Sequence, residues 1–270
     1  MVEIREETDE GAAGDQPEQS TSQAPPRHTN QRGSVIAHLQ NHPVDSLLWI
    51  LRMVTVVFTL LYAFPIFGVQ TQASFYSKTL LAGAATNALR LHQRLGGFHL
   101  SREFFSQMFL EDACHYLFYC VLFLGSHPVT MVLLPVFLFA FLHASSYTMQ
   151  LLAVAGMHDG TLNRLLQRIT SEYMHTLLNV ISCSEIFMMP MVVMMTFMGY
   201  CSLLLPFIYY RFLTMRYMSR RNPNTRQAFY QIRVALDQAV QQPRCPTAIR
   251  YAVERGISFV ERLAPAPTVA

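Results

Sequence analysis

Charge is scarce in this chain, and the scarcity excludes an ordinary soluble domain. Only 14% of the 270 residues are charged, whereas 51% are hydrophobic. A soluble domain usually carries roughly 25% charged residues. So few polar groups cannot cover the apolar surface of the folded chain, and lipid must cover it instead. The composition therefore predicts a membrane protein.

Further absences narrow the class. No cysteine pair has the C-x₂-C spacing of a zinc site, so we interpret the five cysteines as small buried hydrophobes. No N-x-[ST] sequon occurs, so nothing indicates glycosylated lumenal loops. The signatures G-x-S-x-G, H-E-x-x-H, G-x-G-x-x-G and the Walker loop are also missing. We therefore expect no enzyme activity and no cofactor.

The chain divides by composition into a tail, a membrane domain and a basic region. Its first 33 residues are acidic, rich in Gln, Ser and Pro, and lack the apolar core of a signal peptide. Such a composition favours disorder. We predict a disordered acidic tail over 1–40, a multi-pass transmembrane domain over 41–210, a basic cytosolic region over 211–264, and a short tail over 265–270.

Four apolar segments are candidates for membrane crossing. About 20 apolar residues suffice to cross the hydrocarbon core. The fourth segment exceeds this length, so we expect it to be kinked, broken or partly interfacial, with Pro190 and Pro206 as candidate breaks. The four segments are Leu47–Val69, the stretch 104–124 with its uncharged part Ala113–Gly125, Val129–Leu152, and Leu177–Tyr210.

Two further patterns complete the predicted fold. The turn sequence Ser126-His127-Pro128 separates the second and third segments and predicts a membrane hairpin. Thr71–Leu95 mixes apolar residues with Lys78, Arg90 and Arg94, so we expect an amphipathic helix in the membrane interface. The predicted fold class is all-α. It is a multi-pass helical membrane protein with three to four spans including a hairpin, plus amphipathic interfacial helices.

The distribution of arginine predicts the orientation of the C-terminus. Ten arginines between Arg211 and Arg262 follow the uncharged run Ile186–Tyr210. Arginines just past a span usually stay in the cytosol, so we expect a cytosolic C-terminus. The basic residues do not decide between three crossings with a lumenal N-terminus and four crossings with both ends cytosolic.

The basic region contains two segments with helical periodicity, each apolar on one face and charged on the other. This pattern is typical of helices that lie on a membrane with anionic headgroups. The alternative is that the two helices pack on each other as a small cytosolic bundle. We do not expect direct nucleic-acid binding, because the arginines follow a membrane span. The candidate membrane-binding residues are Arg216, Arg220, Arg221, Phe229, Ile232, Leu236, Ile249, Val253, Ile257 and Val260.

Four polar side chains in the apolar domain are candidates for a site. Glu111 and His115 have the i,i+4 spacing that can hold a metal, with Asp112 between them. No second such pair appears, so we favour a polar contact within the protein over a metal site. Glu185 is intramembrane if the last segment starts at Leu177 and lies at the membrane boundary if it starts at Ile186. Intramembrane acids are candidates for function.

Several stretches resemble the transmembrane protein 33 family, also called Krüppel homologue 2, with its yeast pore-membrane relatives. The resemblance covers roughly 41–264 and has no catalytic residues to carry over. It implies residence in the endoplasmic reticulum and nuclear envelope, association with reticulon-type proteins that shape tubules, and a link to nuclear-pore components. The stretches are Ala73-Ser74-Phe75-Tyr76, the segments 88–95, 110–117 and 206–214, His127-Pro128-Val129-Thr130-Met131, and Ser219-Arg220-Arg221-Asn222-Pro223.

The function hypothesis combines the residue patterns with this resemblance. We expect a non-enzymatic membrane protein that organises curved or tubular membrane through its hairpin and its amphipathic helices. The alternative is a subunit that modulates an ion channel or transporter through Glu111, Asp112 and Glu185.

Overall fold

The computed structural model describes residues 35–64, 68–96, 101–157, 159–219, 223–242 and 245–263. The predicted acidic tail lies largely outside these residues. Within them every regular element is a helix, and three helices are long and apolar enough to cross a membrane, namely Pro43–Ala63, Thr130–Val154 and Met174–Phe197. The predicted all-α, multi-pass fold class is therefore confirmed. The helices of the described residues are α1 Val35–Asn41, α2 Pro43–Ala63, α3 Val69–Leu95, α4 Arg102–Leu110, α5 Asp112–Leu124, α6 Thr130–Val154, α7 Thr161–Glu172, α8 Met174–Phe197, α9 Leu205–Met218, α10 Asn224–Val240 and α11 Thr247–Leu263.

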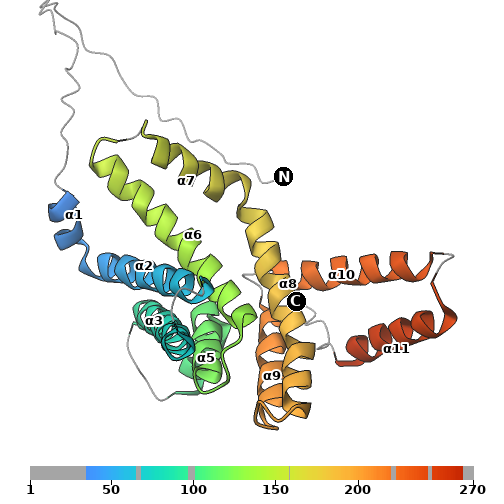
Figure 1. Ribbon diagram of the computed structural model, residues 1–270. Coiled ribbons are helices and arrows are strands. Elements are labelled where there is room, and N and C mark those ends of the chain that lie inside the picture. The colour runs from blue at the N-terminus through green and yellow to red at the C-terminus, as the bar shows by residue number, and fades with distance from the viewer. Residues whose placement is uncertain are drawn as a thin grey trace, which may run out of the picture. The chain divides into compact units, whose positions relative to one another are not determined.

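The overlong fourth segment is broken, as expected, but at a glycine. Gly199 adopts φ 79°, a left-handed conformation that favours glycine, and it follows the end of α8. Pro190 lies inside α8, and Pro206 lies in the first turn of α9, where a proline is tolerated. The run therefore forms two antiparallel helices that lie side by side (Figure 1).

Residues 71–95, predicted as an interfacial helix, are not among the candidate spans of the described residues. They form α3, which packs lengthwise against α2 and α5. Gly83 allows the close approach, because a Cβ there would lie 2.9 Å from Val136 Cγ1 and 3.2 Å from Cys120 Sγ. Lys78 lies over the ring of Phe75, 5.6 Å from its centroid. The charges of this segment are thus accommodated by helix contacts.

Three pairs of consecutive helices share short connections: α2 with α3, α5 with α6, and α8 with α9. Helix α2 packs against α3, and α8 packs against α9. Helices α5 and α6 meet through side chains, since the Tyr119 hydroxyl of α5 donates to the Val132 carbonyl of α6 at 3.0 Å. The three connections lie at one end of the bundle. The Tyr62 hydroxyl near the end of α2 lies 3.4 Å from Thr130 Oγ1 at the start of α6. The His127 ring, between α5 and α6, lies 5.6 Å from the Tyr200 ring, between α8 and α9. We call this end of the bundle the turn end.

The opposite end carries the charged residues, and we call it the charged end. Here the start of α2 meets the C-terminal part of α6, since Trp49 Nε1 donates to Thr148 Oγ1 at 3.0 Å. A core of aromatic and aliphatic side chains from α3, α5, α6, α8 and α9 joins the two ends, with Tyr119 and Phe212 fully buried. The bundle therefore separates an uncharged end from a charged one.

Candidate functional site

A buried cluster of ionic side chains joins three helices near the charged end. Arg216 of α9 donates from Nε to Glu185 Oε2 of α8 at 3.2 Å, and from a terminal nitrogen to Asp112 Oδ1 of α5 at 3.0 Å. The side chains of Arg216 and Glu185 are both 0% exposed, whereas that of Asp112 is 38% exposed. Arg216 is thus held between one fully buried acid and one that reaches solvent. We call these three residues the Arg216 cluster.

Tyrosines complete the coordination of Glu185. The Tyr116 hydroxyl donates to Glu185 Oε1, and the Tyr209 hydroxyl donates to the Glu185 backbone carbonyl at 2.8 Å. The Arg216 guanidinium also lies over the Tyr116 ring, 5.0 Å from its centroid, a cation–π geometry. Both carboxylate oxygens of Glu185 therefore have a donor, which a buried charge requires.

The local structure explains why the acids lie here. Glu111 is the residue between α4 and α5, and its carboxylate accepts from Arg94 of α3 at 2.7 Å. Asp112 begins α5, where the helix dipole stabilises negative charge. His115 Nε2 donates to the Phe109 carbonyl at 2.7 Å, and its Nδ1 lies 3.9 Å from Asp112. Glu111 and His115 thus have separate partners.

The cluster is arranged for structural linkage more than for chemistry. Arg216 and Arg94 engage the three acids, and the described residues contain no group of three or more His, Cys, Asp or Glu placed to hold a metal. Glu185 lies within the candidate span Met174–Phe197, so its intramembrane position stays a prediction. Because each contact joins a different helix, the cluster fixes α5, α8 and α9 relative to one another.

The predicted headgroup-binding role of Arg216 does not fit this structure. Its guanidinium is enclosed by the bundle and cannot reach lipid headgroups while the cluster is intact. The sequence analysis identified Glu185 but not the cation that pairs with it, although an acid inside a membrane usually has such a partner. The sequence did offer a candidate for this cation. Arg216 is the second of the ten arginines that follow the last apolar run.

The other candidate membrane-binding residues lie on α10 and α11. Helix α10 packs against α8, and Phe229 stacks edge-on with Tyr217 at 5.6 Å between centroids. Helix α11 contacts α10, where Arg233 pairs with Glu261, yet Ile249 is 53% exposed and Val260 is 47% exposed. The helix–helix contact of the alternative is thus present, and part of the apolar face of α11 stays open. Of the remaining candidates, Leu236 is exposed, and three are half-buried, namely Ile232, Val253 and Ile257. Arg220 and Arg221 lie outside the described residues.

The all-helical bundle and its three helices that are long and apolar enough to span a bilayer define a multi-pass helical membrane protein. Comparison with known proteins identifies the family. The family model described as Transmembrane protein 33/Nucleoporin POM33 matches residues 27–266. The chain belongs to this family.

Curated relatives support the same membership. The chain is 44% identical over 235 residues to Transmembrane protein 33 of Homo sapiens, which covers 87% of this chain and 95% of the relative. It is 41% identical over 260 residues to Krueppel homolog 2 of Drosophila melanogaster, which covers 95% and 93%. The family description and these names state no enzymatic activity. No solved structure gives a significant match.

Proposed function

We propose that this chain is a non-enzymatic protein of the endoplasmic reticulum and nuclear envelope that organises curved membrane. The observation that carries the proposal is the separation of charge along the bundle. Residues 53–77, 113–158 and 186–210 contain no Asp, Glu, Lys or Arg, and each run includes the connection between two consecutive helices. The turn end is therefore suited to apolar surroundings.

The charge separation favours insertion of all three pairs from one side. The chain has 20 Lys and Arg residues, and none lies in the three uncharged runs. With both ends of the membrane domain at the charged end, these residues face the cytosol together, in agreement with the positive-inside rule. We therefore favour an even number of crossings, with the N- and C-terminal sides of the domain both cytosolic.

The helix lengths within the pairs are unequal. At 1.5 Å per residue, α6 with 25 residues is about 38 Å long, whereas its partner α5 with 13 residues is about 20 Å long. The hydrocarbon core is about 30 Å thick, so the short helix of a pair cannot cross it alone. A pair whose short helix begins at the cytosolic surface therefore turns within the bilayer, and it places more protein cross-section in the cytosolic leaflet than in the opposite one. When one leaflet has the larger area, the bilayer curves so that this leaflet lies on the convex side.

The C-terminal helices support the same role. Ile249 and Val260 are exposed on α11, which also carries Arg250 and Arg255. A helix of this type binds at the headgroup level of anionic membrane and adds area to one leaflet. The shallow helix and the hairpins would then act in the same direction.

The experiment is reconstitution of the full-length chain into liposomes with anionic lipid, imaged by electron cryomicroscopy over a range of protein densities. We expect tubules or strongly curved vesicles at high density. Liposomes that stay spherical at every density would contradict the proposal. Ile257→Asp places a charge on the apolar face of α11 and should weaken tubulation, whereas Ser258→Asp adds the same charge on the opposite face and should not.

Native cysteines provide a direct test of the orientation. Cys245 lies between α10 and α11, and Cys201 lies between α8 and α9 at the turn end. Variants that retain one of them are exposed to a membrane-impermeant maleimide in intact microsomes. We expect Cys245 to react from the cytosol and Cys201 not to react. Labelling of Cys201 from the cytosolic side would refute one-sided insertion.

The partners follow from resemblance and from the family description, which includes a nucleoporin. We propose reticulon-like membrane proteins and nuclear-pore components as partners, with anionic lipid as the direct ligand of α11. A tagged full-length chain should enrich at tubular endoplasmic reticulum and at the nuclear rim. A uniform distribution over sheets and tubules would count against both associations.

The channel-modulating alternative finds less support. It requires acids that face a water-filled path, but Glu185 is fully buried and both of its carboxylate oxygens accept hydrogen bonds. Neutralising Glu111, Asp112 or Glu185 should therefore leave ion flux in reconstituted vesicles unchanged. A change in flux would favour the alternative.

A further inference from the structure

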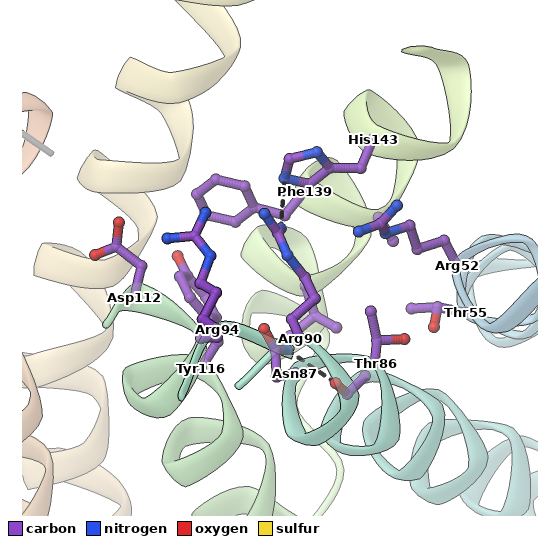
Figure 2. Close-up of a pocket in the computed structure, with 14 residues that line it drawn as sticks. Arg52, Thr55, Thr86, Asn87, Arg90, Arg94, Asp112, Tyr116, Phe139 and His143 are labelled. Atoms are coloured by element: carbon purple, nitrogen blue, oxygen red, sulfur yellow. Dashed lines mark hydrogen bonds between the residues drawn. The ribbon is translucent and has the colours of Figure 1, made fainter. Parts of the chain in front are cut away.

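A cavity of about 250 Å³ lies among α2, α3, α5 and α6. Figure 2 shows Arg52 from α2, Arg90 and Arg94 from α3, and His143 from α6 directed into this space. Ligand pockets for drug-sized molecules range from about 300 to 1,000 Å³, so this cavity suits a small polar group. Three guanidiniums around one small cavity indicate an anion.

The arginines are not matched by acids. Arg94 is neutralised by Glu111 at 2.7 Å. Asp112, the one acid that lines the cavity, forms its ion pair with Arg216. Arg90 donates to His143 Nε2 at 3.0 Å, and because a guanidinium has no acceptor, the imidazole nitrogen must be the unprotonated one. A neutral histidine leaves the charge of Arg90 in place.

Arg52 lacks even a neutral partner. Within the described residues it forms no hydrogen bond or ion pair, although it is only 9% exposed and belongs to the candidate span Pro43–Ala63. Asp45 attracts it without coming within ion-pair distance. An unpaired guanidinium inside a membrane helix is costly, and such residues usually mark a binding or transport site. Arg52 and Arg90 together leave two positive charges at the cavity.

We propose that this cavity binds a phosphate group that is not a diester, that is, a phosphate monoester or free phosphate. Such a group carries a charge of about −1.5 to −2 near neutral pH, which matches Arg52 and Arg90. Guanidinium is also the side chain best suited to bind phosphate oxygens through paired hydrogen bonds. The donor of a phosphate group can be a lipid headgroup that enters between the helices or free phosphate from the cytosol.

Neutral groups of α3 complete the cavity. The Thr86 hydroxyl donates to the Ala82 carbonyl at 2.8 Å, so its oxygen is available to accept from a protonated phosphate oxygen. Asn87 Nδ2 donates one hydrogen to the Gly83 carbonyl at 2.8 Å and retains a second one for the ligand. The site thus combines two charged forks with a neutral acceptor and a neutral donor.

The experiment measures binding to the full-length chain in a neutral detergent. The probes are short-chain phosphatidic acid, a monoester lipid, inorganic phosphate, and phosphatidylglycerol, a diester with one charge. We expect phosphatidic acid or inorganic phosphate to raise the melting temperature and phosphatidylglycerol to have a weaker effect. Arg52→Gln and Arg90→Gln should each weaken binding by about tenfold or more, because each removes a charged hydrogen-bond donor.

Controls separate the site from general charge. Arg168→Gln removes an exposed arginine on α7 and should leave binding unchanged. Since Arg52 has no partner to lose, Arg52→Gln should fold, and its melting temperature without ligand should equal or exceed that of the wild type. If it does not fold, Arg52→Lys retains the charge without the fork and should also bind more weakly.

Each outcome of the binding experiment either supports the phosphate site or rules it out. Binding of phosphatidic acid alone identifies a lipid headgroup, and binding of inorganic phosphate identifies the free ion. The proposal is overturned if the wild-type chain binds neither probe, if phosphatidylglycerol binds equally well, or if the arginine variants bind like Arg168→Gln. Because no curvature is measured, failure here leaves the membrane-organising function untouched.

Discussion

Replacing Arg216 with leucine removes the cation that contacts both Glu185 and Asp112. Glu185 is 0% exposed, so after this change its charge has only the Tyr116 hydroxyl as a side-chain donor. Removing one partner of a buried ion pair usually costs about 3–5 kcal/mol. Asp112 adds little to the loss, because its side chain is 38% exposed and water can solvate it. We therefore expect Arg216→Leu to lower the free energy of unfolding by about 3–5 kcal/mol.

The assay is unfolding of the full-length chain in mixed micelles, followed by circular dichroism during titration with a denaturing detergent. Arg168→Leu is the matched control, since Arg168 is 65% exposed and pairs with Glu172 on the same helix. A surface pair of this kind contributes at most about 1 kcal/mol. A cost for Arg216→Leu below about 1 kcal/mol, or equal to that of the control, would refute the assignment of a buried ion pair.

A double-mutant cycle sharpens the result. Glu185→Leu combined with Arg216→Leu removes both charges, so neither is left buried without a partner. The double variant should therefore be less destabilised than the sum of the two single variants, with a coupling energy above about 1 kcal/mol. Additive effects would mean that the two side chains do not interact in the folded protein.

Three further predictions follow from the packing. Gly83→Val should destabilise the bundle by about 1–3 kcal/mol, because any Cβ there meets Val136 and Cys120. The control Gly125→Val has open space around it and should cost less in the same detergent titration. Gly199→Ala should cost about 1–2 kcal/mol because φ is 79° there, and an unchanged unfolding midpoint would contradict that turn geometry. In the third test, the C-terminal segment is released from the full-length chain by proteolysis, and its flotation with anionic liposomes is measured. Ile257→Asp should reduce this flotation, whereas the control Ser258→Asp should not. Equal flotation of both variants would argue against a membrane contact of α11.

Several elements could be predicted from sequence because their causes are local. Uncharged runs indicated the candidate spans, the Ser126-His127-Pro128 sequence indicated the turn between α5 and α6, and helical periodicity indicated α10 and α11. The break in the fourth segment was also expected, but its position was not. A proline is the stronger local signal, yet the left-handed φ at Gly199 depends on how α8 and α9 pack.

The contacts of α3 could not be predicted for a related reason, and its interfacial position stays a prediction. Its charges are local facts, but their partners are distant in sequence. Arg90 lies 53 residues before His143, and Lys78 approaches Phe58 on the preceding helix. Residue composition alone assigned the segment to the membrane interface, because the contacts that let it pack inside the bundle exist only in the folded chain.

The sequence alone determined that this is a helical membrane protein of the transmembrane protein 33/nucleoporin POM33 family, since composition, span length and family motifs are properties of the chain itself. The tertiary structure decided which charges meet. Arg216 contacts Glu185 across 31 residues and Asp112 across 104, and Arg52 and Arg90 face one cavity from separate helices. Burial makes these contacts strong and specific, and burial is set by helix packing.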